Sequence, residues 1–159
     1  MRGPSSRPPR LRGGQTGGVA LVGTYTPSSV GWVRAEVEHL ERTGGSAFKD
    51  RPVVLLTTVG ARSGLLRKTP LMRVAHAGSY AAVASMAGAD RHPDWYANVR
   101  ARPEVELRDG PLVLELVARE LAGAERAAWW SRACTVFPSY VGYQSRTRRQ
   151  IPILVLEPA

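Results

Sequence analysis

The stretch RPVVLLTTVGARSGLLRKTPLMRV, residues 51–74, decides the fold of this chain. Its apolar and β-branched run, residues 53–58, has the length and composition of a strand that is buried on both faces. Gly60 and Gly64 bound a short turn, and residues 67–74 then resume a strand-like pattern. Strands joined by tight turns are antiparallel, because a parallel pair needs a crossover of about a dozen residues or more.

The same alternation of strands and turns continues toward the C-terminus. Residues 67–74 and 79–86 are predicted to pair as an antiparallel hairpin around a turn at Ala77 and Gly78. A second hairpin and a closing strand are predicted over residues 105–108, 112–117 and 151–156. Few helices stand between these strands, so the pattern favours a small antiparallel barrel or roll over a doubly wound parallel sheet.

Helical spacing of apolar residues marks the remaining segments. Three helices are predicted, over residues 30–40, 93–99 and 122–134. Ser28 and Ser29 are candidate N-cap residues of the first helix, and Gly44 with Gly45 supplies its stop signal. Pro93 is expected at the first position of the second helix, where its missing N–H carries no penalty.

The chain has 159 residues, enough for one domain with a core but too few for two of ordinary size. We expect a flexible, basic arm over residues 1–27, rich in Gly, Pro, Ser and Arg, and a single domain over residues 28–159. No stretch approaches the roughly 20 apolar residues that cross a bilayer, and the arm lacks the apolar run of a secretory signal. The single cysteine, Cys134, cannot form an intramolecular disulfide, so a cytoplasmic location is expected.

The net charge of +9 at pH 7 favours an anionic partner. A basic module that binds nucleic acid is one interpretation, because small barrels can bind single strands through stacking aromatic residues. In this sequence the aromatic residues fall mainly on the predicted helices and a loop, so we expect no nucleic-acid partner.

Several catalytic classes lack their signatures. His39, His76 and His92 are scattered, without ligand spacing or a nearby cysteine, so no metal is expected. Nucleophile-elbow, dinucleotide-binding and Walker patterns are also missing. Cys134 follows two tryptophans on an apolar helix and is interpreted as a buried thiol.

Two clusters of residues could bind a ligand. The first is the turn with Arg62 and the following strand with Arg67 and Lys68, which fits either an anion site or a solvated hairpin end. Ala84 and Ser85 would lie beside it if the register of the hairpin is simple. The second cluster is aromatic and polar, and fits either core packing or a planar heteroaromatic ligand. It comprises Trp95, Tyr96, Asn98, Phe137, Ser139, Tyr140, Tyr143 and Gln144.

Three runs carry a resemblance to a known family: residues 51–74, residues 81–107 (AAVASMAGADRHPDWYANVRARPEVEL) and residues 136–158 (VFPSYVGYQSRTRRQIPILVLEP). In order and spacing they resemble the deazaflavin-dependent nitroreductases of actinobacteria. The resemblance implies a split β-barrel like that of the FMN-binding pyridoxamine phosphate oxidases, mainly antiparallel β with flanking helices. It also implies coenzyme F420, a deazaflavin with a phosphate and an oligoglutamate tail, as cofactor.

The resemblance further assigns roles to single positions. It implies cofactor-binding roles for Arg62, Arg67, Thr69, Pro70, Ala84, Ser85, Met86, Trp95 and Asn98. Ser85, Tyr140 and Tyr143 are expected to orient the acceptor or donate a proton to it. The chain departs from the family's pattern at Thr69, Met86 and Asp94. Met86 stands where a lysine is usual, which is expected to weaken binding of the acidic tail.

The expected activity is hydride transfer from reduced F420 to a small electron-poor acceptor, a quinone or a nitro compound. The alternative enzyme is an FMN-dependent oxidoreductase of the same barrel fold. The basic arm and the first helix could also contact an anionic membrane, although Glu36, Glu38 and Glu41 reduce that attraction. The sequence leaves the oligomeric state open.

Overall fold

The computed structural model describes residues 21, 23–44 and 52–159. Within this part of the chain, seven strands form one antiparallel sheet: β1 (Val53–Val59), β2 (Leu66–Met72), β3 (Ala75–His76), β4 (Ser79–Val83), β5 (Glu104–Asp109), β6 (Leu112–Glu120) and β7 (Ile153–Glu157). The helical elements are α1 (Gly31–Thr43), the 3₁₀ turn η1 (Met86–Gly88), α2 (Asp94–Ala101), α3 (Gly123–Val136) and α4 (Ser139–Ser145).

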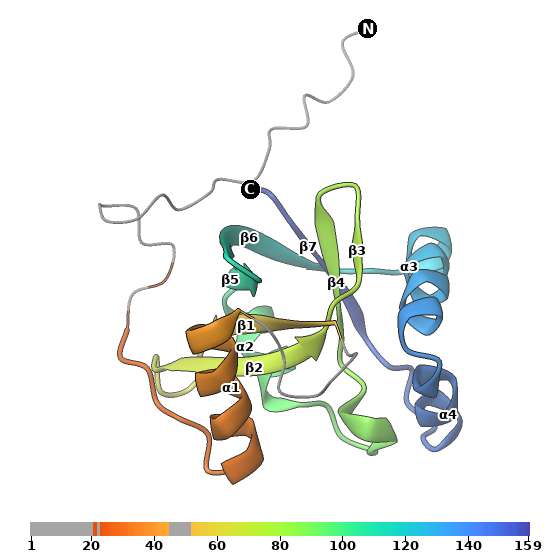
Figure 1. The fold of residues 1–159 in the computed structure, drawn as a ribbon. Helices are drawn as coiled ribbons and strands as arrows, with labels where there is room; N and C mark the ends of the chain where they lie inside the picture. Colours follow the sequence, from red (N-terminus) through yellow and green to blue (C-terminus); the bar gives the residue numbers. More distant parts are fainter. Residues whose placement is uncertain (1–20, 22, 45–51) are drawn as a thin grey trace, which may run out of the picture.

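The sheet is curled into a split barrel. Its strand order is β2-β1-β5-β6-β7-β4-β3. Strand β2 is at one end of this order and β4 is next to the other end, yet the two strands are in contact. Figure 1 shows β1 and β2 running across the direction of β4 and β7. Such curling brings distant strands of one sheet together around a shared core. The predicted fold class, mainly antiparallel β in a split barrel with flanking helices, is confirmed.

Strand β1 is buried on both faces, as predicted. Val54 and Leu56 join the core inside the barrel, and Leu55, which points to the opposite face, packs with Val37 and Leu40 of α1. All residues of β1 after the first are buried. The apolar run therefore belongs to a strand covered by the barrel core on one side and by a helix on the other.

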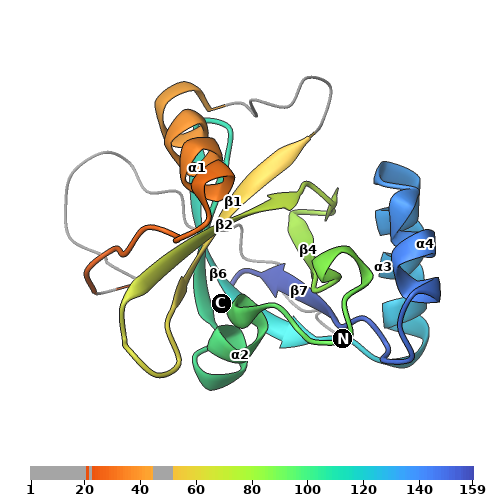
Figure 2. The same ribbon diagram turned by 90° about the horizontal axis from the view of Figure 1, so that it is seen from below.

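Helices cover the barrel on separate flanks. Ala82 of β4 and Leu154 of β7 face the barrel core, whereas their neighbours Val83 and Ile153 join a second cluster with Trp129 of α3 and residues of α4. In both views α3 and α4 lie side by side on one flank, and α1 lies on the other (Figure 1, Figure 2).

The predicted hairpin of residues 67–74 with 79–86 is wrong in its pairing. Strand β2 pairs along its whole length with β1, from Val59 opposite Leu66 to Val53 opposite Met72. The turn at Ala77 and Gly78 joins only the two-residue strand β3 to the start of β4. Strands β1 and β2 are neighbours in sequence and form their own hairpin across the turn at residues 60–65, whereas β4 pairs with the distant strand β7. The second predicted hairpin, β5 with β6, is confirmed.

The helix predictions are confirmed apart from details at two N-termini. The N-cap of α1 is Val30, and Ser28 acts just outside the helix by accepting a hydrogen bond from the Val30 N–H (3.1 Å). Gly44 ends α1 in the left-handed conformation, as predicted, whereas Gly45 lies outside the described residues. Pro93 is the N-cap of α2 rather than its first helical residue.

Most of the predicted arm, residues 1–27, lies outside the described residues, and its character stays a prediction. Where the structure describes its end, the chain lies on the barrel. Leu66 of β2 donates its N–H to the carbonyl of Thr24 (2.9 Å), and Thr26 donates its N–H to the carbonyl of Leu66 (3.0 Å).

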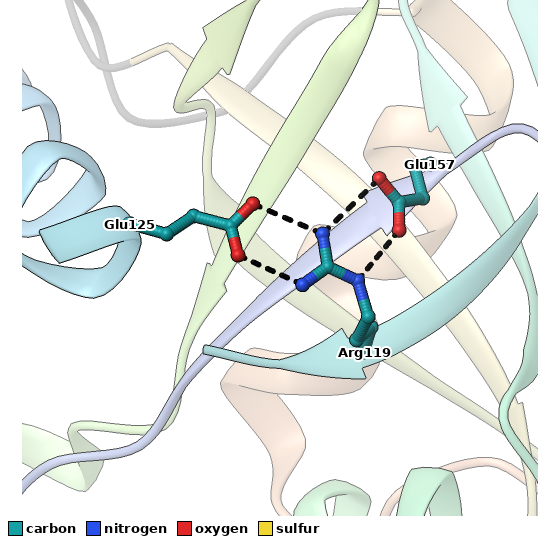
Figure 3. A network of polar contacts seen from close by, with 3 residues as sticks. All are labelled: Arg119, Glu125 and Glu157. Atoms are coloured by element: carbon teal, nitrogen blue, oxygen red, sulfur yellow. Dashed lines mark hydrogen bonds and ion pairs between the residues drawn. The ribbon is translucent and has the colours of Figure 1, made fainter. Parts of the chain in front are cut away.

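A cluster of three charged residues fastens α3 to the sheet (Figure 3). Arg119 of β6 donates to both carboxylate oxygens of Glu125 on α3, at 2.8 and 3.0 Å, and to Glu157 of β7, at 2.8 and 3.5 Å. These hydrogen bonds raise the pKa of Arg119 and lower the pKa of Glu125.

Among the described residues, no helix is both long and apolar enough to span a membrane.

Candidate active site

A cavity of about 550 Å³ opens between β2, the start of α1, the η1 segment, α2 and α4. This volume suits a small organic ligand or cofactor. Eight of the predicted site residues line it: Arg67, Thr69, Pro70, Ser85, Met86, Trp95, Asn98 and Tyr140. The structure thus gathers residues from segments far apart in the sequence into one site.

The basic wall of the cavity is strand β2. Six consecutive residues, 67–72, line the cavity, although successive side chains of a strand point to opposite faces. The cavity therefore extends around the edge of the sheet. Arg67 and Lys68 supply positive charge there, and Lys68 also pairs with Glu41 of α1 and lies over the ring of Tyr25 (4.5 Å). This wall favours an anionic group on the ligand.

The second wall is the segment from Ser85 through η1 (Figure 2, green, after β4). Three successive residues, Met86, Ala87 and Gly88, have positive φ angles of 45°, 54° and 81°. A left-handed conformation costs about 1–2 kcal/mol for a residue with a side chain, so this segment carries strain at two positions. It places Ser85 and Met86 at the cavity.

The third wall is α2, which contributes Trp95 and Asn98. Both are buried yet line the cavity. Asn98 also joins α2 to β1 and to the turn that follows it. Its Nδ2 donates to Oγ1 of Thr58 (3.1 Å), and its Oδ1 accepts from the N–H of Ala61 (2.9 Å). Asn98 therefore holds the turn that carries Arg62, besides facing the cavity.

The fourth wall is formed by Tyr140 of α4 and by Phe137, two residues before this helix. The Tyr140 ring packs edge-on against Phe137 (centroids 5.0 Å apart) and lies 6.2 Å from the Tyr143 ring. Burial, followed by the neighbouring Tyr143 and Cys134, raises the pKa of Tyr140 above its ordinary value of 10. Tyr140 is consequently a neutral hydroxyl at physiological pH and can donate a hydrogen bond.

Three predicted site residues do not line the cavity: Arg62, Ala84 and Tyr143. Arg62 is exposed on the turn after β1. Ala84 has no accessible surface, and its backbone is used internally: its N–H donates to Pro152 and its carbonyl accepts from Arg149. Its predicted backbone contact with a ligand stays a prediction. The Tyr143 ring contacts the Tyr140 ring. Roles for Arg62 and Tyr143 stay predictions.

Two residues of interest were missed by the sequence analysis. Trp32 lines the cavity from the first turn of α1, and 62% of its surface is exposed. Arg149, in the link between α4 and β7, donates to the backbone on either side of η1. The sequence pointed to Arg149 only as part of the basic run before the closing strand. That run could not predict where the Arg149 side chain points, and no pattern pointed to Trp32.

The site combines cations, hydroxyls and aromatic rings. Among the described residues, no group of three or more His, Cys, Asp or Glu is placed to hold a metal ion. The basic wall of β2 suits a phosphate or carboxylate, and the rings of Trp95 and Phe137 suit a planar heterocycle. Ser85 and Tyr140 can hydrogen-bond to an oxygen of a second molecule. These residues fit a heteroaromatic redox cofactor with an anionic tail.

Comparisons with known proteins find similar chains of one family. The family model of the F420H(2)-dependent quinone reductases matches residues 32–158. An F420H(2)-dependent quinone reductase of Mycobacterium tuberculosis strain H37Rv is 36% identical over 108 residues, 66% of this chain and 72% of that protein. A solved structure described as an F420-H2 dependent reductase is 50% identical, has a TM-score of 0.65 and covers 71% of this chain and 100% of that one.

Other solved structures have a similar fold. One described as a domain-swapped dimer is 46% identical, with a TM-score of 0.65 over 79% of this chain and 97% of that one. A heme-binding protein of Mycobacterium smegmatis shares the fold alone, at 16% identity and a TM-score of 0.53 over 67% of this chain and 46% of that one. The family match and the site support the F420 interpretation over the FMN and nucleic-acid alternatives. The chain belongs to the F420H(2)-dependent quinone reductase family.

Proposed function

We propose that the cavity binds reduced coenzyme F420 beside a quinone and that the chain transfers a hydride between them. The observation that carries this proposal is the single cavity in which basic strand β2, the aromatic residues of α2 and the hydroxyls of Ser85 and Tyr140 meet. The cofactor, when bound, supplies the hydride; the chain supplies binding, orientation and exclusion of water.

Arg67 and Lys68 bind the anionic part of the cofactor in this proposal. Both side chains lie on the wall where the cavity extends around the sheet edge, so the phosphate and tail can leave toward solvent. Arg62, exposed on the neighbouring turn, extends the same basic surface. Thr69, Pro70 and the buried Trp95 hold the planar ring system.

Ser85 and Tyr140 act on the acceptor. Both line the cavity and both can donate a hydrogen bond to a quinone oxygen as negative charge develops on it. Nitro compounds are a second class of acceptor in this proposal, because their oxygens gain negative charge in the same way. Tyr143 supports Tyr140 through ring contacts rather than touching the acceptor.

A titration tests the cofactor. Purified protein is titrated with F420 and, in parallel, with FMN, each followed by fluorescence; menadione is then added to the complex with reduced F420. We expect saturable binding of F420 and rapid oxidation of the reduced cofactor by menadione. Saturable binding of FMN alone, or of neither cofactor, would contradict the proposal.

A variant tests the acceptor side. Ser85→Ala is expected to slow hydride transfer by about 10- to 1000-fold, the range found for loss of one preorganised donor, with little change in F420 affinity. Ser131→Ala, at an exposed position on α3, is the matched control. Equal single-turnover rates for Ser85→Ala and wild type would show that Ser85 has no such role.

We also propose that the protein works in the cytoplasm with peripheral contact to the membrane, where lipid quinones reside. The exposed apolar residues Trp32 and Met86 (37% exposed) line the cavity. Two further exposed apolar residues are close to cavity residues in sequence: Val30 (46%), the N-cap of α1, and Val141 (59%), which follows Tyr140 on α4. Co-sedimentation with anionic phospholipid vesicles tests this contact. Binding that Val141→Asp weakens is expected; the absence of wild-type binding would contradict it.

A further inference from the structure

Arg149 links the walls of the cavity, although it does not line the cavity itself. Its guanidinium donates to three backbone carbonyls: Nη1 to Ala84 (3.1 Å), Nη2 to Ser85 (2.9 Å) and Nε to Ala89 (2.7 Å). Two of these carbonyls precede η1 and one follows it. The Arg149 side chain therefore connects the residues before η1 to the residue after it.

The bridged segment is the strained one. Met86 and Ala87 adopt left-handed conformations that side chains disfavour, so the surrounding contacts must hold them there. Within the segment, the Ser85 carbonyl accepts from the N–H of Gly88 (2.9 Å), and the Met86 carbonyl accepts from that of Ala89 (3.1 Å). Charge-assisted hydrogen bonds from a guanidinium are stronger than these neutral ones.

Arg149 is itself fixed to the helix that carries Tyr140. Gln144 of α4 donates through Nε2 to the carbonyl of Arg149 (2.8 Å) and accepts through Oε1 from the N–H of Ile151 (2.9 Å). The backbone of Arg149 is thus tied to α4 while its side chain is tied to the η1 segment. Arg149 spans the two walls that present the Ser85 and Tyr140 hydroxyls.

A contact to α2 completes this arrangement. Nη1 of Arg149 also donates to Nδ1 of His92 (3.1 Å), and the His92 ring lies 4.6 Å from the ring of Tyr96 on α2. One planar fork of five donors can satisfy acceptors in several directions at once, whereas a lysine ammonium at the same place is a point donor on a flexible stem.

We propose that Arg149 is a positioning residue: its guanidinium holds the η1 segment in the conformation that sets the Ser85 hydroxyl relative to Tyr140. The expected effect of Arg149 on the rate of hydride transfer rests on the proposed function. Its effect on the conformation of the η1 segment can be measured without any cofactor. Arg149 acts through Ser85, so its contribution to rate should disappear when the Ser85 hydroxyl is removed.

Hydrogen exchange measures how firmly Arg149 holds the η1 segment. Amide exchange of residues 84–92 is followed by mass spectrometry in wild type, Arg149→Lys, Arg149→Gln and the control Arg148→Gln, which alters an exposed neighbour. We expect both Arg149 variants to speed exchange in this segment by about tenfold or more, with the core strands unchanged, and Arg148→Gln to match wild type. Unchanged exchange in Arg149→Lys would overturn the proposal.

A double-mutant cycle measures the catalytic consequence. We expect Arg149→Lys to slow single-turnover oxidation of reduced F420 by about tenfold in the wild-type background and by less than about twofold in Ser85→Ala. An equal loss in both backgrounds would overturn positioning through Ser85. If wild type binds no F420, the proposed function fails, and hydrogen exchange alone decides the role of Arg149.

The wild-type protein offers a measurement that needs no substitution. In ¹⁵N NMR spectra, the Nε–H of Arg149 should exchange slowly with water, because it donates to the Ala89 carbonyl. Rapid exchange of this proton, as for an exposed arginine, would overturn the proposal even where the Arg149 variants fail to fold.

Discussion

Burial keeps the hydroxyl of Tyr140 protonated. Its ring is packed among Trp130, Phe137 and Tyr143, and 5% of its surface is accessible. Removing water from a phenol disfavours the phenolate, which raises its pKa. The hydroxyl thus keeps its proton over a wider pH range than a tyrosine in solution does.

We predict that Tyr140→Phe slows quinone reduction and that the ratio of wild-type to variant rate stays constant from about pH 7 to about pH 10. The raised pKa keeps Tyr140 in its donating, neutral form throughout this range. Single-turnover rates at several pH values provide the measurement. A ratio that declines with an apparent pKa of about 10 would show that Tyr140 ionises normally.

Besides lining the cavity, Asn98 joins α2 to β1 and to the turn that follows it. Its side chain bonds both to Thr58 of β1 and to the backbone of the next turn. We predict that Asn98→Ala lowers the free energy of unfolding by about 1–3 kcal/mol, because the buried hydroxyl of Thr58 and the N–H of Ala61 lose their partner. Urea denaturation measures this loss.

Thr58→Val is the matched control for Asn98. It has nearly the same shape as wild type and removes the acceptor of Nδ2 while leaving the bond to Ala61, so a smaller loss is expected. An Asn98→Ala protein as stable as wild type would contradict the view that these hydrogen bonds fasten α2 to the barrel.

At the scale of elements, the close packing of η1 on α4 depends on Gly88. A Cβ at Gly88 would lie 2.7 Å from the carbonyl oxygen of Tyr143 and 3.0 Å from its Cα. Since these are backbone atoms, α4 itself would have to move to make room. The helix that presents Tyr140 is therefore seated directly on the segment that presents Ser85.

We predict that Gly88→Ala destabilises the protein more than Gly78→Ala does. The two glycines have almost equal φ angles, +81° and +80°, but a Cβ at Gly78 meets no atom within 4 Å. The Gly78 variant thus measures the backbone strain alone, about 1–2 kcal/mol. Thermal unfolding compares them, and equal losses of stability would show that α4 is not constrained by Gly88.

At the scale of the whole molecule, α3 is joined to the sheet by charges as well as by its apolar face. Arg119 lies between carboxylates from α3 and β7 (Figure 3). All three side chains are substantially exposed, so the cluster directs where α3 sits more than it adds stability. The apolar contacts of Trp129 and Ala133 bury this helix against the barrel.

The acid dependence of stability tests this cluster. Arg119 lowers the pKa of Glu125 chiefly by hydrogen bonding, so the stabilisation is present above the ordinary pKa of 4.5 and is lost as pH falls through the lowered value. We predict that Glu125→Gln lowers Tm near neutral pH and that the difference from wild type shrinks below about pH 4.5. Glu104→Gln, at the exposed start of β5, is the control; a constant difference at every pH would contradict this assignment.

The sequence by itself determined the local structure. β-Branched runs and turn residues mark β1 and the β5–β6 hairpin correctly, because strand propensity and turn geometry are properties of neighbouring residues. The ordered motifs also identified the family, and with it eight residues that line the cavity, including Ser85 and Trp95.

The tertiary structure alone decided which strands pair and where side chains point. Strand β4 pairs with β7, and β1 pairs with β5, across long stretches of sequence, because closing the barrel buries apolar surface that these distant strands share. The reach of Arg149 across some sixty residues to the Ser85 segment is a contact of the same kind. Long-range contacts follow from the shape of the whole core, which no local pattern of residues contains.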